Sequence, residues 1–271
     1  MAAGVRTFVG EIGARTCENE GLNANLGLVL TPEGTLLIDS GATWQSAQAF
    51  ATAAAKVGAT RIKSVVNTGG QDHRWLDNGL FKAQGAELVA HANGQADMQS
   101  RGSEYLQGLR VVLAAKADGT LPTRWISGEN ESLELGGLRI ELKHRGSALT
   151  PGDRRVWPQQ QCVLFSGDVV YTQRMSRVLP VGNTKHWLQT SAIIEALKPR
   201  VLVPGHGAPT DVATAKAGTQ AYLFALREHM KQAVDEGQDV SPAVRSFDAR
   251  LFMRLLNAAE LMPGNTSRTY L

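Results

Sequence analysis

Residues 64–79 read SVVNTGGQDHRWLDNG, and this stretch decides how the rest of the chain is interpreted. It opens within an apolar, β-branched run that is typical of a buried strand. The pair Gly69-Gly70 then allows a sharp turn, after which the chain presents Asp72 and His73. A carboxylate and an imidazole are typical metal ligands, but one such pair does not complete a coordination shell. We therefore expect partner ligands at the ends of other strands.

Length and composition are those of an ordinary globular protein. The chain has 271 residues, with 28 Lys and Arg against 25 Asp and Glu, and a formal net charge of +3. This balance is far below the concentrated basic surface that nucleic-acid binding usually requires, and no apolar run reaches the length of a transmembrane helix. We expect a soluble protein that acts on a small-molecule substrate, with neither nucleic acid nor a membrane as its partner.

The N-terminus and the cysteines leave more open. Residues 1–15 contain no apolar stretch of signal-peptide length, so we expect a cytoplasmic protein, or a periplasmic one if a signal segment has been removed. Cys17 and Cys162 form no metal-spacing motif and are too few for a disulfide scaffold, although one bridge between them stays open. The oligomeric state is not predicted.

Strand and helix patterns alternate through the first half of the chain. Two apolar runs separated by Thr-Pro-Glu-Gly predict a β-hairpin over residues 26–39, and an amphipathic helix follows over 43–57. Further patterns predict strands at 62–66 and 87–90 and helices at 75–84 and 91–113. Strands that alternate with helices favour an α/β fold.

The second half repeats this theme. Strands are predicted at 132–135, 138–143, 155–157, 162–165 and 200–203, with a helix at 187–197 before the last of them. A long amphipathic helix begins at residue 211, and a last helix is predicted at about 249–262. We find no linker, low-complexity segment or short repeat. Residues 1–271 are therefore interpreted as one domain of two similar halves, with a core over about 20–210 and a C-terminal helical extension over 211–271.

Three strand ends supply metal-type ligands. Asp72 and His73 follow the run SVVN, Asp168 follows VLFSG, and His206 follows VLVPG. Two imidazoles and two carboxylates suit zinc, iron or manganese. We predict these four residues as ligands of one divalent metal, with zinc as the first choice, and Asp72 also as a catalytic residue. The alternative interpretation of the four is a hydrogen-bonded network that holds no metal.

The arrangement resembles the metallo-β-lactamase superfamily. The shared elements are a hairpin that ends in Asp (LLIDSGA), an Asp-His loop after Asn-Thr, a TPGD loop, a strand that ends in Gly-Asp, and PGHG. The C-terminal residues NAAELMPGNTSRTYL are similar to those of a branch associated with quinoprotein relay or sulfur oxidation. The resemblance implies an αββα sandwich with the metal site at one edge between the halves. It also implies hydrolysis of an ester, thioester, lactam or phosphoester by a metal-activated water.

The chain departs from the family pattern in one part of the site. The family has His-x-His-x-Asp-His after Asn-Thr, whereas residues 69–73 of this chain read GGQDH, which is one residue shorter. The family also has a histidine where this chain has Leu149. The three missing histidines would form the first of two metal sites, and the four predicted ligands match the second. We therefore predict a hydrolase with a mononuclear site. The alternative is a degenerate binding protein or pseudo-enzyme without a functional metal centre, and a nuclease of this fold is disfavoured.

Four more residues are predicted near the site with weaker roles: Asp39, Gln71, Arg74 and His144. Asp39 is expected to orient the metal loop by hydrogen bonds to its backbone, and Gln71 to assist the ligands or the substrate. His144 precedes Leu149 by five residues and could substitute for a lost ligand. Arg74, together with Arg174, Arg177 and Lys185 of a later loop, is hypothesised to supply lost positive charge and to anchor an anionic substrate.

Overall fold

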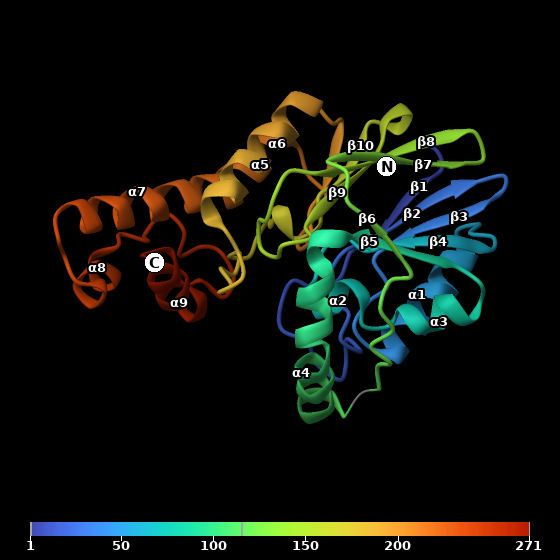
Figure 1. Cartoon of the computed structure of the whole chain (residues 1–271), viewed down its shortest axis with the longest axis horizontal. Coiled ribbons are helices and arrows are strands. Elements are labelled where there is room, and N and C mark those ends of the chain that lie inside the picture. The colour runs from blue at the N-terminus through green and yellow to red at the C-terminus, as the bar shows by residue number, and fades with distance from the viewer. Residues whose placement is uncertain (1, 115, 271) are drawn as a thin grey trace.

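Two mixed β-sheets form the centre of the molecule, which the computed structural model describes over residues 2–114 and 116–270. The strand order of the first sheet is β1-β2-β3-β4-β5-β6, and that of the second is β11-β10-β9-β8-β7. Figure 1 shows α1 and α3 beside the first sheet, and the C-terminal helices at the opposite end of the molecule. None of the helices in the described ranges is long and apolar enough to cross a membrane.

The first sheet begins with antiparallel strands and continues with parallel ones. β1 (Val5–Phe8), β2 (Leu26–Thr31) and β3 (Gly34–Ile38) are antiparallel, and β2 and β3 form the predicted hairpin. β4 (Ile62–Val66), β5 (Glu87–His91) and β6 (Arg124–Ile126) then add in parallel. Helices lie in the connections between these parallel strands, as such crossovers require: α1 (Trp44–Lys56), α2 (Asp72–Trp75), α3 (Asn78–Ala83) and α4 (Gln95–Leu113).

The second sheet is mostly antiparallel. β7 (Asn130–Leu135), β8 (Leu138–His144), β9 (Arg154–Pro158) and β10 (Val163–Phe165) pair in this order. β11 (Val201–Val203) joins β10 in parallel, and α5 (Thr184–Leu197) connects the two. The strands predicted for this half are therefore present, whereas β1 and β6 were not predicted, and the helix expected at 75–84 is split into α2 and α3 at Leu76 and Asp77.

Three apolar clusters hold the layers together. The cluster between the sheets contains Val66 and Val89 of the first sheet and Val156 and Phe165 of the second. Another packs the outer face of the first sheet against α1 and α3. The third packs the outer face of the second sheet against α5 and the C-terminal helices. The layers are thus helix, sheet, sheet and helix, which confirms the predicted αββα sandwich.

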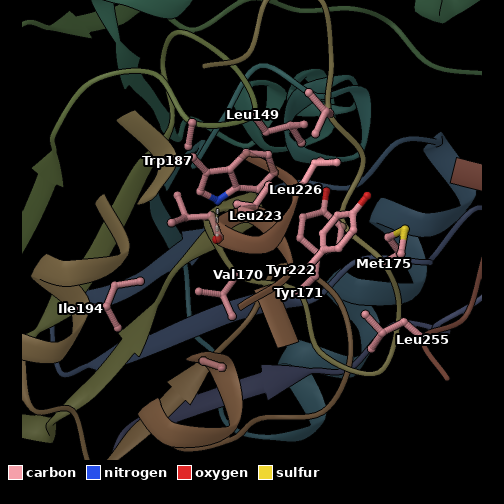
Figure 2. Packing of buried hydrophobic residues seen from close by; sticks show 14 of the residues in the cluster. Leu149, Val170, Tyr171, Met175, Trp187, Ile194, Tyr222, Leu223, Leu226 and Leu255 are labelled. Carbon is pink, nitrogen blue, oxygen red and sulfur yellow. Dashed lines mark hydrogen bonds between the residues drawn. The ribbon is translucent and has the colours of Figure 1, made fainter. Parts of the chain in front are cut away.

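The C-terminal helices share their core with the second sheet. α6 (Val212–Ala215) leads through a π-helical segment (Lys216–Gln220) into α7 (Ala221–Asp235), and α8 (Val240–Ser246) and α9 (Ala258–Tyr270) follow. Figure 2 shows Tyr222, Leu223 and Leu226 of α7 in one cluster with Trp187 of α5 and with Leu149. The extension is therefore packed onto the sandwich and buries part of it.

The prediction of a last helix at about 249–262 is wrong in position. Turns, a bend and an isolated β-bridge at Leu256 occupy residues 250–257, and α9 begins at Ala258 and continues through Pro263. Asn265 explains why the polar end of the chain stays helical and packed. Its buried amide accepts a hydrogen bond from the backbone N–H of Val178 and donates to the hydroxyl of Tyr222. These partners are distant in sequence, so local patterns do not indicate them.

Candidate metal centre

Three side chains from three strand ends converge where the two sheets meet. His73 lies in α2, after the loop that follows β4. Asp168 lies in a 3₁₀ turn after β10, and His206 follows β11. One ligand atom of each residue lies within 4.8 Å of those of the other two, and all three residues are buried. The structure thus brings together three of the four predicted ligands, one from the first half of the chain and two from the second.

A hydrogen bond at Nδ1 of each imidazole fixes the orientation of the ring. Nδ1 of His206 lies 2.6 Å from the carbonyl oxygen of Asn23, which can only accept, so Nδ1 carries the proton. Nδ1 of His73 lies 3.1 Å from a carboxylate oxygen of Asp72 and donates to it. With Nδ1 engaged in this way, each ring turns its Nε2 towards Asp168, at 3.0 Å for His73 and 3.2 Å for His206.

This arrangement fits a metal cation. Burial lowers the pKa of His206 to about 3, so its ring is neutral at physiological pH. Although burial acts to raise the pKa of Asp168, the guanidinium of Arg74 and the ring of His73 hold that pKa well below its ordinary value. The neutral ring of His206 turns a nitrogen lone pair towards this ionised carboxylate, and a cation beside both would relieve their repulsion. Two imidazoles and one carboxylate are a donor set that zinc, iron and manganese accept.

Asp72 lies beside this group and outside it. Both of its oxygens accept hydrogen bonds from Arg15, at 2.6 and 3.0 Å, and one also accepts from His73. Although burial acts to raise the pKa of Asp72, the Arg15 guanidinium and His73 lower it below its ordinary value. Asp72 therefore orients the ring of His73 as an ionised acceptor. The predicted roles of Asp72 as ligand and catalytic residue stay predictions.

Arg74 provides an internal positive charge next to Asp168. Its side chain is 1% exposed, and it donates to both oxygens of Asp168, at 2.5 and 3.2 Å. It also donates to the carboxylate of Asp39 at 2.9 Å and to the carbonyl of Asn25 at 3.0 Å. Burial acts to lower the pKa of Arg74, but Asp168 and Asp39 raise it above its ordinary value. Each oxygen of Asp168 thus faces one guanidinium N–H and one imidazole.

Asp39 connects this ion pair to the loop that leads from β4 to His73. Its carboxylate accepts hydrogen bonds from the backbone N–H and the hydroxyl of Thr68, at 2.7 and 2.8 Å. Burial raises the pKa of Asp39, while Arg74 and Thr68 act in the opposite direction. The hydrogen bonds to Thr68 hold the start of the loop that carries His73. This is the position that was predicted for Asp39.

Glycines allow the chain to approach the site closely. A Cβ atom on Gly205 would lie 2.5 Å from Oδ1 of Asp168 and even nearer to a guanidinium nitrogen of Arg74. Gly167, whose φ is +53°, would place a Cβ 2.5 Å from the hydroxyl oxygen of Thr68. A side chain at either position would separate the two halves of the site. The glycine before each second-half ligand is therefore required by space, and Gly167 also by its backbone conformation.

Protein atoms fill the place where the missing histidines would be. A Cβ on Gly69 would lie 2.6 Å from Asp153, and one on Gly70 would lie 2.6 Å from Asp97. Leu149 is fully buried in the apolar cluster of Figure 2, close to Trp187, whose indole nitrogen donates to the carbonyl of Val169. The first metal site of the family pattern is thus closed by packing as well as by the loss of its ligands.

A cavity of about 240 Å³ opens onto the remaining group. Its walls include His73 and His206 together with Asp72, Tyr171 and Gln71. Gln71 accepts a hydrogen bond from the hydroxyl of Tyr105 on α4. The aromatic ring of Tyr171 stacks on His206, with ring centroids 4.8 Å apart. A small molecule in this cavity would contact the rings of His73 and His206.

The remaining predicted residues differ in whether they reach the cavity. Arg174 and Arg177 line the cavity, whereas Lys185 is exposed on α5 and does not. Arg74 is covered by Asp168 and Asp39, so it supplies charge but does not reach a substrate in the cavity. His144 is stacked on His91 with ring centroids 3.6 Å apart, and its Nδ1 bonds the carbonyl of Asp153. The structure does not bring His144 to the ligand group.

Sequence patterns missed three contributors to the site: Arg15, Asn23 and Tyr171. Arg15 and Asn23 lie in the irregular segment before β2, where nothing in the pattern separates them from solvated loop residues. Asn23 acts through its backbone carbonyl, which leaves no trace in its side-chain type. Tyr171 follows Asp168 by three residues and was available as an aromatic residue near a predicted ligand.

Cys17 and Cys162 are both free and exposed, so no bridge joins them.

Comparisons with known proteins agree with this architecture. A metallo-β-lactamase family protein from Thermus thermophilus superposes with a TM-score of 0.68 at 17% identity, covering 96% of this chain and 92% of that one. A metallo-β-lactamase from Pontibacter korlensis gives a TM-score of 0.56 at 20% identity, with coverages of 71% and 84%. The stereoselective inverting sec-alkylsulfatase Pisa1 from Pseudomonas sp. gives 0.66 at 18% identity, covering 92% of this chain and 47% of that one.

A match to a protein-family model decides the family, because the structural relatives are too dissimilar in sequence to do so. A separate comparison with individual curated proteins gave no match. None of the structural relatives described above carries the name of the quinoprotein-relay or sulfur-oxidation branch, so that finer assignment stays a prediction. The family model for the metallo-beta-lactamase superfamily matches residues 19–206, which include the hairpin, the loop with His73, and both second-half ligands. The chain belongs to the metallo-beta-lactamase superfamily.

Proposed function

We propose that the protein is a metal-dependent hydrolase with a single metal ion. The observation that supports this most directly is the convergence of Nε2 of His73, Nε2 of His206 and the carboxylate of Asp168, with both histidines in the wall of a cavity. The closed packing around Gly69, Gly70 and Leu149 supports one ion in place of two. The three residues would hold the ion and leave coordination positions open towards the cavity, as catalytic sites do.

The reaction is hydrolysis of an ester, thioester, lactam or phosphoester. A bound metal ion of this kind lowers the pKa of a water and polarises the oxygen of the electrophile. In the overall reaction the hydroxyl of water joins the carbonyl or phosphoryl centre, the bond to the leaving group breaks, and a proton passes to the leaving group. Asp72 and the carbonyl of Asn23 keep the two rings oriented, and Arg74 holds Asp168 ionised and fixed. We give Asp72 this positioning role in place of proton transfer, because its lowered pKa makes it a weak base.

Elemental analysis of the purified protein tests the metal. We expect about one zinc, iron or manganese per chain, and a loss of that metal in His73→Ala and in His206→Ala. His186→Ala is the matched control, because His186 is exposed at the start of α5 and lies outside the ligand group. Protein that stays free of metal after supplementation would contradict the proposal.

A second candidate is a binding protein or pseudo-enzyme without a functional metal centre. The position of Arg74 favours it, because both oxygens of Asp168 already accept hydrogen bonds from a buried guanidinium. A metal-free protein that nevertheless binds a small molecule in the cavity would support this candidate. A panel of chromogenic esters, thioesters, lactams and phosphodiesters, tested on metal-loaded protein, separates the two. Turnover that disappears in His206→Ala favours the hydrolase.

A further inference from the structure

A second cavity lies next to the metal site, between α4 and the N-terminal segment. Its volume is about 410 Å³, which is within the range that holds small organic ligands. Leu109, Leu113 and Val112 of α4 are the large aliphatic residues of its lining, and Gly108 leaves part of the wall without a side chain. Val112 is 65% exposed, so a bulky apolar residue lies open to solvent at this surface.

This apolar cavity adjoins the cavity of the metal site. The two share three lining residues, which are Ala14, Arg15 and Asp72. Asp72 also bonds the ring of His73, so one residue contacts both the metal-site ligand and the apolar cavity. Ala14, Arg15 and Asp72 thus form the boundary between the two cavities, and a molecule that extends from the ligand group across this boundary would reach the apolar cavity.

The charges around the apolar cavity do not favour a second polar ligand there. Arg15 and Asp72 neutralise each other through two hydrogen bonds. The remaining charged residue of the lining is Glu104, which would repel an anion. What the cavity offers is aliphatic surface, and its burial by a ligand is favourable in proportion to the apolar area removed from water.

We propose that the apolar cavity holds the hydrocarbon acyl group of the substrate, so that the enzyme prefers esters or thioesters of medium-chain fatty acids. This inference rests on the proposed hydrolase function, since the scissile carbonyl would lie at the metal-site cavity while the chain passes Arg15 and Asp72. The apolar cavity then selects for chain length, and the ligand group performs the same hydrolysis on every member of the series.

A chain-length series tests the proposal. We expect kcat/KM for p-nitrophenyl esters to rise about fourfold per methylene from the acetate onward, until the cavity is filled. Gly108→Trp is the blocking variant, because a Cβ on Gly108 would meet nothing within 4 Å and the side chain has open space to occupy. We expect it to remove the preference for long chains. Gln107→Trp, at the neighbouring exposed position outside the lining, is the control and should keep the preference.

Binding of uncharged 1-octanol separates this inference from the hydrolase itself. Calorimetric titration of metal-free protein should show binding that Gly108→Trp weakens at least tenfold and Gln107→Trp leaves intact. Binding of this kind without hydrolysis of any ester would support the apolar cavity and contradict the proposed function. Hydrolysis of short esters with no chain-length preference and no octanol binding would overturn the inference and leave the hydrolase in place.

Discussion

Arg74 determines the charge balance of the site, because it is the buried cation that contacts both Asp168 and Asp39. Replacing it with methionine, which keeps much of the volume, leaves two buried carboxylates without their partner. Removal of one member of a buried ion pair typically costs about 3–5 kcal/mol of unfolding free energy. We expect a loss of this size for Arg74→Met in urea denaturation. Arg177→Met is the control, since Arg177 is exposed with its nearest carboxylate at 3.9 Å, and it should change stability by less than about 0.5 kcal/mol.

Asp77 is a fully buried carboxylate whose two oxygens have no hydrogen-bond partner among the described residues. Burial and the neighbouring Asp118 raise the pKa of Asp77 to about 7. The native state therefore keeps the carboxyl group of Asp77 protonated at pH values where the unfolded chain has lost that proton. The free energy of unfolding consequently falls as pH rises from about 4 to about 7.

Asp77→Asn removes this cost. We expect the variant to gain unfolding free energy over the parent as pH rises through that window, by at least about 1 kcal/mol at pH 8 and by much less at pH 4.5. Denaturation of metal-free protein at both pH values measures the difference. Asp239→Asn, at an exposed position, should show no such trend. An equal effect at both pH values would mean that ionisation of Asp77 is not the cause.

The elements that local patterns predict well are those whose burial is uniform along the chain. The hairpin of β2 and β3 and the parallel strand β4 have continuous apolar runs bounded by turn residues, and their predicted bounds agree with the structure to within about a residue. The end of the chain behaves differently. α9 is fixed by Asn265, whose partners are about 40 and 90 positions away in sequence, and β6 is too short to show a period.

The residues of the candidate site likewise divide into those that local sequence patterns predict and those that only tertiary contacts bring together. His73, Asp168 and His206 were found because each follows an apolar strand, and parallel or adjacent strands end at a common edge. Arg15 and the carbonyl of Asn23 come from an irregular segment whose path depends on tertiary contacts. The charge of Arg74 and its position after His73 predict contact with an anionic substrate. Its burial between Asp168 and Asp39 follows from the three-dimensional position of α2, which no spacing in the sequence indicates.

The π-helical segment Lys216–Gln220 supports the site from behind. Its Thr219 is buried, and its hydroxyl accepts from the backbone N–H of Tyr171 and donates to the carbonyl of the same residue, both at 2.8 Å. Tyr171 in turn forms a β-bridge with His206 and stacks on its ring. Local π-helical turns are frequent at functional sites, and here the segment brings the hydroxyl of Thr219 to the backbone of Tyr171.

Thr219→Val should therefore affect the metal through Tyr171. The change preserves shape and removes both hydrogen bonds, and loss of such indirect support typically lowers metal affinity about 10- to 100-fold. Competition with a fluorescent chelator measures the affinity. Thr214→Val, on the exposed side of the preceding helix, should leave it unchanged. Unaltered affinity in Thr219→Val would show that Tyr171 does not need this anchor.

At the scale of the whole molecule, the ligand group joins the two halves of the sandwich. His73 belongs to the half built on the first sheet, while Asp168 and His206 belong to the half built on the second. Arg74 and Asp168 make the same connection through an ion pair. A cation at this position would therefore stabilise the contact between the halves as well as serve the reaction.

Metal removal should lower the stability of the entire fold for this reason. A ligand that binds only the native state adds about 2.7 kcal/mol at a free concentration of 100 times its Kd, which raises the Tm of a protein of this size by about 5–10 °C. We expect a shift of this order when zinc is added to chelator-treated protein in differential scanning calorimetry. His206→Ala should abolish the shift, and so should His73→Ala, because each removes a ligand from a different half. His186→Ala should retain it. A shift that survives in both ligand variants would place the stabilising metal elsewhere, whereas its loss in both would show that one ion holds the two halves together.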